Sequence, residues 1–120
     1  MKKIIFLLLT FTSFIFAGDY DREERILERE FNRNFPVLET GKNIRLKEID
    51  VDIKRDGGVE VEVEFARGSQ VNTADYHIYA DKLSVVFKDK IQSSLGSNFY
   101  LREIELDSSG IRNDKQTFRY

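Results

Sequence analysis

Acidic side chains that alternate with apolar ones are the residues in this chain whose types and spacing suggest chemistry. Asp50 and Asp52 alternate with isoleucine and valine, and Glu60, Glu62 and Glu64 alternate with valine and phenylalanine. A period of two places the carboxylates on one face of a strand and the apolar side chains on the other. Such a face could bind a cationic partner or a loosely held divalent ion, and paired carboxylates also serve acid–base catalysis.

The two acidic segments are separated by the turn sequence RDGG at Arg55–Gly58, which predicts a hairpin. If Ile53 pairs with Val59, like charges face each other at three positions: Asp52 with Glu60, Asp50 with Glu62 and Glu48 with Glu64. Directly opposed like charges destabilise a sheet. Either water and salt screen them on a solvated face, or the acidic face is kept because it binds a cationic partner.

Several other chemistries are excluded by the residue inventory. The chain has no cysteine, so it has no thiol nucleophile, thiolate metal site or disulfide. Its one histidine, His77, is expected at the boundary of the core or at the surface. The stretch Asp50–Gly58 has a superficial likeness to a calcium loop, but Lys54 and Arg55 occupy ligand-region positions and Val61 stands where the closing glutamate belongs. We therefore expect no catalytic residues, no metal site and no cofactor.

The chain repeats itself. GKNIRLKEIDVD at Gly41–Asp52 and GSNFYLREIELD at Gly96–Asp107 are identical at six of twelve positions. Apolar residues spaced by four precede both segments, which is typical of one face of a helix: Leu27, Phe31 and Phe35 before the first, and Leu83, Phe87 and Ile91 before the second. Chance similarity of two strands is the alternative, but the shared order of elements favours a tandem duplication with units at about 21–66 and 73–120.

These units predict an α+β domain of order αββαββ. We expect a four-stranded, mainly antiparallel sheet with two helices on one face and the carboxylate-rich face opposite. The helices are expected at 22–34, ended by Pro36, and from Asn72 or Thr73 to Leu95, ended by Gly96. The strands are expected at about 49–53, extending back toward residue 44, and at 59–65, 99–106 and 117–120.

A change of apolar parity occurs at the same place in both repeats. It falls at Lys47-Glu48 in the first and at Arg102-Glu103 in the second. A β-bulge would keep the apolar residues on one face, whereas the alternative is a loop before the strand. In the second hairpin, Ile104 opposite Phe118 would set Glu103 against Arg119, so we expect that hairpin to be charge-compensated and the first not.

The N-terminus has the pattern of a secretory signal peptide over residues 1–17. Two lysines precede the apolar run Ile4–Phe16, and Ala17 is a small residue at the expected cleavage position. A retained anchor is the alternative, although a spanning helix needs roughly 20 apolar residues. Residues 18–120 would form one exported domain, periplasmic or extracellular, with 17 basic and 21 acidic side chains after loss of Lys2 and Lys3.

The lack of a recognisable catalytic motif, the signal peptide and the acidic face together favour a non-enzymatic binding module of the cell envelope. The net negative charge argues against nucleic acid as a partner and favours a protein or other cationic partner. The binding residues are predicted to be Asp50, Asp52, Glu60, Glu62 and Glu64, with Tyr100 as an exposed aromatic side chain. The alternatives are a small exported hydrolase with paired carboxylates and an envelope structural protein that self-associates through its last strand.

Overall fold

The structure, a computed structural model, describes residues 20–34, 37–39, 44–69, 71–108 and 115–120. The predicted signal peptide at 1–17 and Pro36 lie outside these residues. Within the described ranges, none of the helices combines the length and the apolar character needed to cross a membrane.

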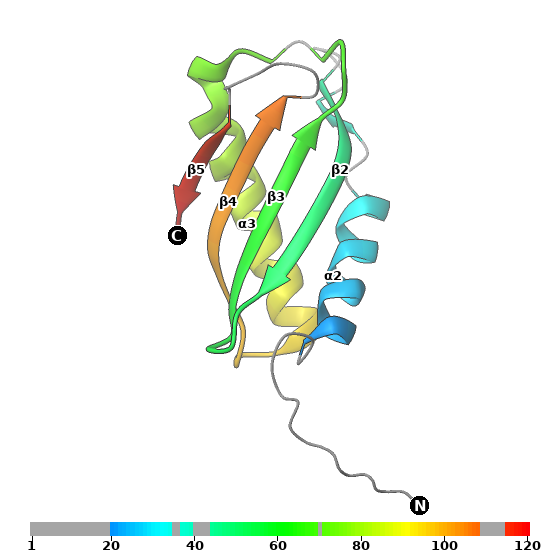
Figure 1. The fold of residues 1–120 in the computed structure, drawn as a ribbon, viewed down its shortest axis with the longest axis vertical. Helices are drawn as coiled ribbons and strands as arrows, with labels where there is room; N and C mark the ends of the chain where they lie inside the picture. The colour runs from blue at the N-terminus through cyan, green and yellow to red at the C-terminus, as the bar shows by residue number, and fades with distance from the viewer. Residues whose placement is uncertain (1–19, 35–36, 40–43, 70, 109–114) are drawn as a thin grey trace, which may run out of the picture.

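In the described residues the fold is α+β, with two α-helices and a mixed, mostly antiparallel sheet (Figure 1). The sheet order follows the chain order, from β1 to β5, and only the β3–β4 pair is parallel. The elements are α2 (Asp21–Asn34), β1 (Val37–Glu39), β2 (Ile44–Ile53), β3 (Gly58–Phe65), a 3₁₀ turn (Thr73–Asp75), α3 (Tyr76–Leu95), β4 (Tyr100–Ser108) and β5 (Gln116–Arg119).

The four predicted strands are present as β2 to β5, and the three-residue β1 is an addition that the sequence did not indicate. The hairpin between β2 and β3 reverses the chain, while α3 returns it so that β4 runs parallel to β3. A helical crossover is the usual connection between parallel neighbours. This parallel pair brings the two hairpins together into one sheet.

The predicted strand registers are confirmed. Ile53 pairs with Val59 across the first hairpin, and Ile104 pairs with Phe118 across the second. The register shifts between Leu46 and Glu48 in β2, and β4 has the corresponding extra residue at Arg102. Both parity changes are therefore β-bulges, which keep the apolar side chains on the buried face.

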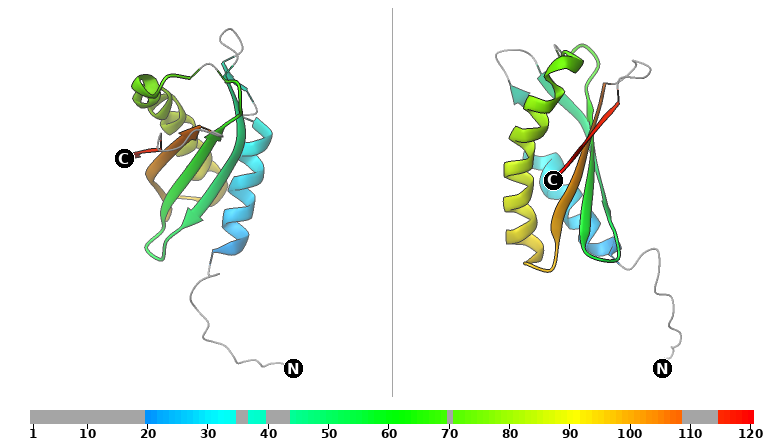
Figure 2. Two further views of the ribbon diagram at one scale, coloured as in Figure 1. Left: turned by 45° about the horizontal axis from the view of Figure 1, so that its top comes forward. Right: turned by 90° about the vertical axis from the view of Figure 1, so that its left-hand side faces the viewer.

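Both helices lie beside the sheet (Figure 2). Their buried apolar side chains form one core cluster with those of the strands. α2 contacts β2, α3 contacts β4, and the helices meet where the rings of Phe31 and Phe87 lie 4.3 Å apart between centroids. The buried strand residues include Ile49, Val51, Val61 and Ile104, each at most 6% exposed. Burial of this alternate set leaves the intervening carboxylates on the opposite side of the strands.

Candidate functional site

Three neighbouring strands place nine carboxylates on one face of the sheet, which we call the acidic face. Because β3 pairs with β2 on one side and β4 on the other, each glutamate of β3 has an acidic neighbour on both sides. The resulting rows are Glu48–Glu64–Asp107, Asp50–Glu62–Glu105 and Asp52–Glu60–Glu103. The sequence predicted the β2–β3 half of this arrangement, and the structure extends it across β4.

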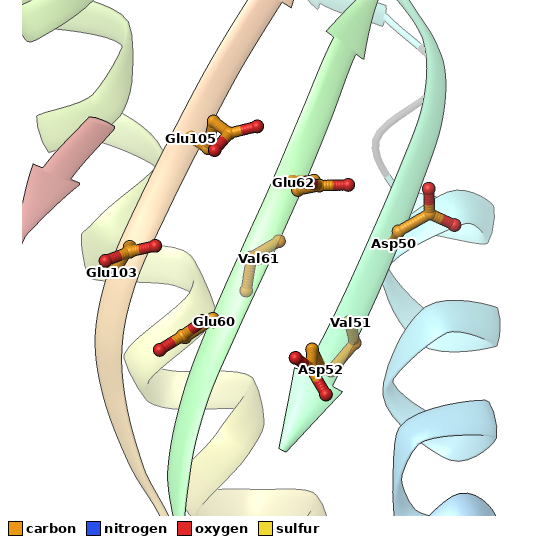
Figure 3. A pocket seen from close by; sticks show the side chains of 8 residues that line it. All are labelled: Asp50, Val51, Asp52, Glu60, Val61, Glu62, Glu103 and Glu105. Carbon is orange, nitrogen blue, oxygen red and sulfur yellow. The ribbon is translucent and has the colours of Figure 1, made fainter. Parts of the chain in front are cut away.

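The acidic face is hollowed at its centre (Figure 3). A cavity of about 230 Å³ is lined by Asp50, Asp52, Glu60, Glu62, Glu103 and Glu105, together with Val51 and Val61. A second hollow of about 70 Å³ adjoins it and includes Glu48, Glu64, Asp107 and Lys115. Four of the predicted binding residues, Asp50, Asp52, Glu60 and Glu62, thus line the first hollow, and Glu64 lines the second.

Cations border the acidic face at one end of the first hairpin. Lys54 Nζ lies 2.8 Å from Asp52 Oδ2 and 3.9 Å from Glu60 Oε1. Arg102 Nη1 lies 3.6 Å from Glu60 Oε2. The expectation that the first hairpin lacks charge compensation is therefore wrong for the Asp52–Glu60 pair, because Lys54 follows β2 directly and β4 contributes Arg102 from outside the hairpin.

Further cations lie along the other borders. Lys47, at the β2 bulge, has its Nζ 3.7 Å from Glu64 Oε2. Lys115 lies 3.5 Å from Glu105, and Arg119 lies 3.9 Å from Glu103, which confirms the compensation expected for the second hairpin. The cations of these pairs are more than half exposed and the N–O distances are 3.5 Å or longer, so each pair contributes little to stability in water.

In the middle row, Asp50–Glu62–Glu105, the glutamate of β3 has a raised pKa. Burial raises the pKa of Glu62, and the neighbouring Glu105 charge and a hydrogen bond between the two carboxyl groups raise it further. In the adjacent row, the charge of Asp50 raises the pKa of Glu48. Two carboxyl groups can share a hydrogen bond only when one carries a proton, so Glu62 and Glu48 retain a proton more readily than isolated glutamates do.

Tyr100 lies at the hairpin end of the sheet, away from the hollow. Its side chain is 45% exposed, as predicted, and its hydroxyl donates to Asp56 Oδ2 at 3.0 Å. The Arg102 guanidinium donates to the Tyr100 hydroxyl at 2.8 Å and forms an ion pair with Asp56. A hydrogen bond from the Gly58 amide lowers the pKa of Asp56. Tyr100 is thus part of a polar cluster that ties the hairpin turn to β4.

The site includes three carboxylates that the sequence analysis did not assign to it. Glu103, Glu105 and Asp107 occupy the repeat positions that correspond to Glu48, Asp50 and Asp52. The repeat therefore carried a signal for them, but their position beside β3 depends on a parallel pairing that the repeat does not specify.

The carboxylates do not form a recognisable metal centre. Across the part of the chain that the structure describes, no group of three or more acidic, histidine or cysteine side chains is arranged to hold a metal ion. The nine carboxylates are spread over three strands, so the attraction of the acidic face for a cation depends on their summed charge.

No family model matches the chain, and no curated protein or solved structure matches it either.

Proposed function

We propose that this protein is an exported, non-enzymatic binding module whose acidic face takes a cationic partner, most simply a basic protein surface. The observation that carries the proposal is the three-by-three arrangement of carboxylates on β2, β3 and β4. Like charges placed directly opposite each other destabilise a sheet. A partner with several lysines or arginines would relieve that repulsion on binding, which gives the arrangement a purpose.

The shape and the charge of the acidic face both support a surface contact. Its centre is hollowed by about 230 Å³, while its cations stand at the border, where they can orient a partner without covering the centre. Complementary charge mainly accelerates association and sets specificity, and salt weakens it. We therefore expect fast, salt-sensitive binding.

The architecture behind this surface is proposed to be a tandem duplication, with both helices on one side of the sheet and the acidic face open on the other. The bulges at Lys47 and Arg102 support the duplication, because they fall at matching positions of the repeat. The pattern of residues 1–17 supports export to a periplasm or the cell exterior.

Binding of oligolysine tests this function. The variant D50N/E62Q/E105Q neutralises the middle row, and E23Q/D75N/D89N removes the same number of charges from the helices and the 3₁₀ turn. Titration calorimetry at low salt should show that the middle-row variant binds oligolysine at least tenfold more weakly, while the control stays close to the wild type. Equal weakening in both variants would mean that net charge alone attracts the peptide and would overturn the proposed site.

A hydrolase with paired carboxylates is the second candidate, because the Glu62 and Glu105 carboxyl groups meet in the hollow and the pKa of Glu62 is raised. A general acid requires such a raised pKa. If the hollow were catalytic, E62Q alone would abolish hydrolysis of a responsive substrate from a panel of chromogenic glycosides and esters. Oligolysine binding with no hydrolysis in that panel would favour the binding module.

A further inference from the structure

The outer edge of β2 is covered by side chains of α2. β1 pairs only with Ile44 and Arg45, so the stretch of β2 from Ile49 to Ile53 lies beyond it. Along this stretch, backbone groups are bonded by side chains from one face of α2: Glu24, Glu28 and Asn32. We call these three residues the helix ladder.

The helix ladder imitates a neighbouring strand. The amides of Ile53 and Val51 donate to Glu24 Oε2 and Glu28 Oε2, each at 2.8 Å. Asn32 makes both bonds that a strand residue would make. Its Oδ1 accepts from the Ile49 amide at 3.1 Å, and its Nδ2 donates to the Ile49 carbonyl at 2.9 Å.

The spacing of the helix ladder suits this role. Its residues are four apart, which is about 6 Å along a helix. The strand residues they bond are two apart, which is about 6.6 Å along a strand. Later residues of α2 bond earlier residues of β2, so the helix and the strand run antiparallel. Tyr20, just before α2, continues the series because its hydroxyl donates to the Arg55 carbonyl at 3.3 Å. One helix face can therefore follow the strand over several steps.

The covered stretch is self-complementary. Its sequence, Ile49-Asp50-Val51-Asp52-Ile53, reads the same in both directions. If two copies paired antiparallel about Val51, each Ile49 would face the Ile53 of the other copy, and both apolar faces would stay aligned. The amides used would be those of Ile49, Val51 and Ile53, which the helix ladder occupies.

A sheet edge with available amides is a template for pairing with another chain, and natural proteins protect such edges with helices, charges or bulges. We propose that the helix ladder is an edge guard that prevents β2 from pairing with β2 of a second copy of this chain. Pairing requires α2 to move off the edge and give up the bonds of the ladder. Charge adds a second barrier, because the antiparallel pairing about Val51 sets Asp50 opposite Asp52 of the other copy.

Removal of the helix ladder tests the edge guard. The variant E24A/E28A keeps helix-forming residues but deletes two rungs, and D21A/E23A removes the same charge from the same helix without touching β2. Light scattering with size-exclusion chromatography should show monomers for the wild type and the control. The E24A/E28A variant should shift to twice the monomer mass as its concentration rises. A folded E24A/E28A variant that stays monomeric at the same concentrations would overturn the proposal.

Charge exchange tests whether the dimer has the proposed register. In the E24A/E28A background, D52K would place each new lysine opposite Asp50 of the other copy, so the dimer should tighten by about tenfold or more. D50K/D52K would restore like-charge opposition and should return the chain toward the monomer. Equal association of the two variants would exclude pairing about Val51.

A single substitution keeps the test valid if E24A/E28A does not fold. E28A removes only the middle rung, at Val51. Hydrogen exchange of the Val51 amide should then become faster than in the wild type in dilute solution and slower as the concentration rises, because pairing protects it again. Exchange that does not depend on concentration would count against a second copy as the occupant of this edge.

Discussion

The two helix–strand–strand segments share a sequence pattern, but their helices make different contacts with the sheet. α2 buries only Leu27 and Phe31 and uses its polar side chains to bond the edge of β2. α3 buries seven residues and forms the main apolar layer against the sheet: Tyr76, Tyr79, Ala80, Leu83, Ser84, Phe87 and Ile91. The first helix therefore protects an edge, whereas the second builds the core.

The difference follows from the place of each segment in the sheet. β4 lies between β3 and β5, so its backbone has strand partners on both sides, and the helix that precedes it contributes packing. β2 has β3 on one side and, beyond the short β1, only α2 on the other. The same local pattern thus supports two roles, and the neighbours decide which one applies.

The largest expected effect comes from truncating the core of each segment. Phe87→Ala should lower the free energy of unfolding by about 3–5 kcal/mol and accelerate hydrogen exchange throughout the sheet. Leu27→Ala should cost about 2–5 kcal/mol, but its fastest exchange should be confined to α2 and the amides of Ile49, Val51 and Ile53. Urea unfolding would measure the loss of free energy in each variant, and hydrogen exchange would show which amides lose protection. Uniform acceleration in Leu27→Ala would show that α2 is not a separate protective layer.

The glycines at the two turns give a smaller contrast. Gly57 and Gly96 both have positive φ, 89° and 95°. At Gly96 an added Cβ meets no atom within 4 Å, so Gly96→Ala should cost only the backbone strain, about 1–3 kcal/mol. At Gly57 the Cβ would also overlap the Asn98 carbonyl, so Gly57→Ala should cost about 1 kcal/mol more than Gly96→Ala, or a larger amount. If urea titrations gave equal losses in the free energy of unfolding for the two variants, the backbone around Asn98 would have moved to admit the added Cβ at Gly57.

The residues at the two bulges, Arg102 and Lys47, should differ in how much they contribute to thermal stability. Arg102 contacts Asp56, Tyr100 and Glu60, and its side chain is 29% exposed. Lys47 reaches only toward Glu64, at 3.7 Å, with its side chain 57% exposed. Arg102→Ala should therefore lower Tm clearly, while Lys47→Ala should leave it nearly unchanged. Calorimetry of both variants at one pH checks this, and a larger loss for Lys47→Ala would contradict it.

The smallest expected effect concerns the middle row of the acidic face. The folded-state pKa of Glu62 is raised above its ordinary value of 4.5, so its contribution to stability is complete below that value and is lost as pH rises through the folded-state pKa. The pKa of Glu48 is raised too, so Glu48 gives the same pH dependence. The pKa of Asp56 is lowered from 3.8, so the stability that Asp56 contributes is lost only as the pH falls below that value.

Glu62→Gln should therefore stabilise the protein at pH 7 by about 0.2–1 kcal/mol and have almost no effect near pH 4. Glu103→Gln is the matched control, because Glu103 has Arg119 beside it. Thermal unfolding across this pH range measures both, and a stabilisation by Glu62→Gln that persists unchanged at pH 4 would refute the electrostatic cause.

Local periodicity in the sequence predicts the acidic face, the register of the first hairpin and the positions of both bulges. The alternation around Asp50 and Glu62 assigned the carboxylates to one face, and the turn at Arg55–Gly58 set the register that opposes them. The parity changes located both bulges. These features depend on the two-residue period of a strand and on the length of a turn, and both can be read along the chain.

Tertiary structure alone decided which strands became neighbours. The parallel pairing of β3 with β4 added Glu103, Glu105 and Asp107 to the acidic face, and no local pattern distinguishes that pairing from other sheet orders. The helix ladder is similar. Glu24, Glu28 and Asn32 have the composition of a solvated helix face, and their bonds to β2 exist only because α2 packs beside an edge. Such contacts join residues far apart in the chain. The period of the side chains predicts which face of a helix or strand is apolar, but it does not predict which other element lies beside that face.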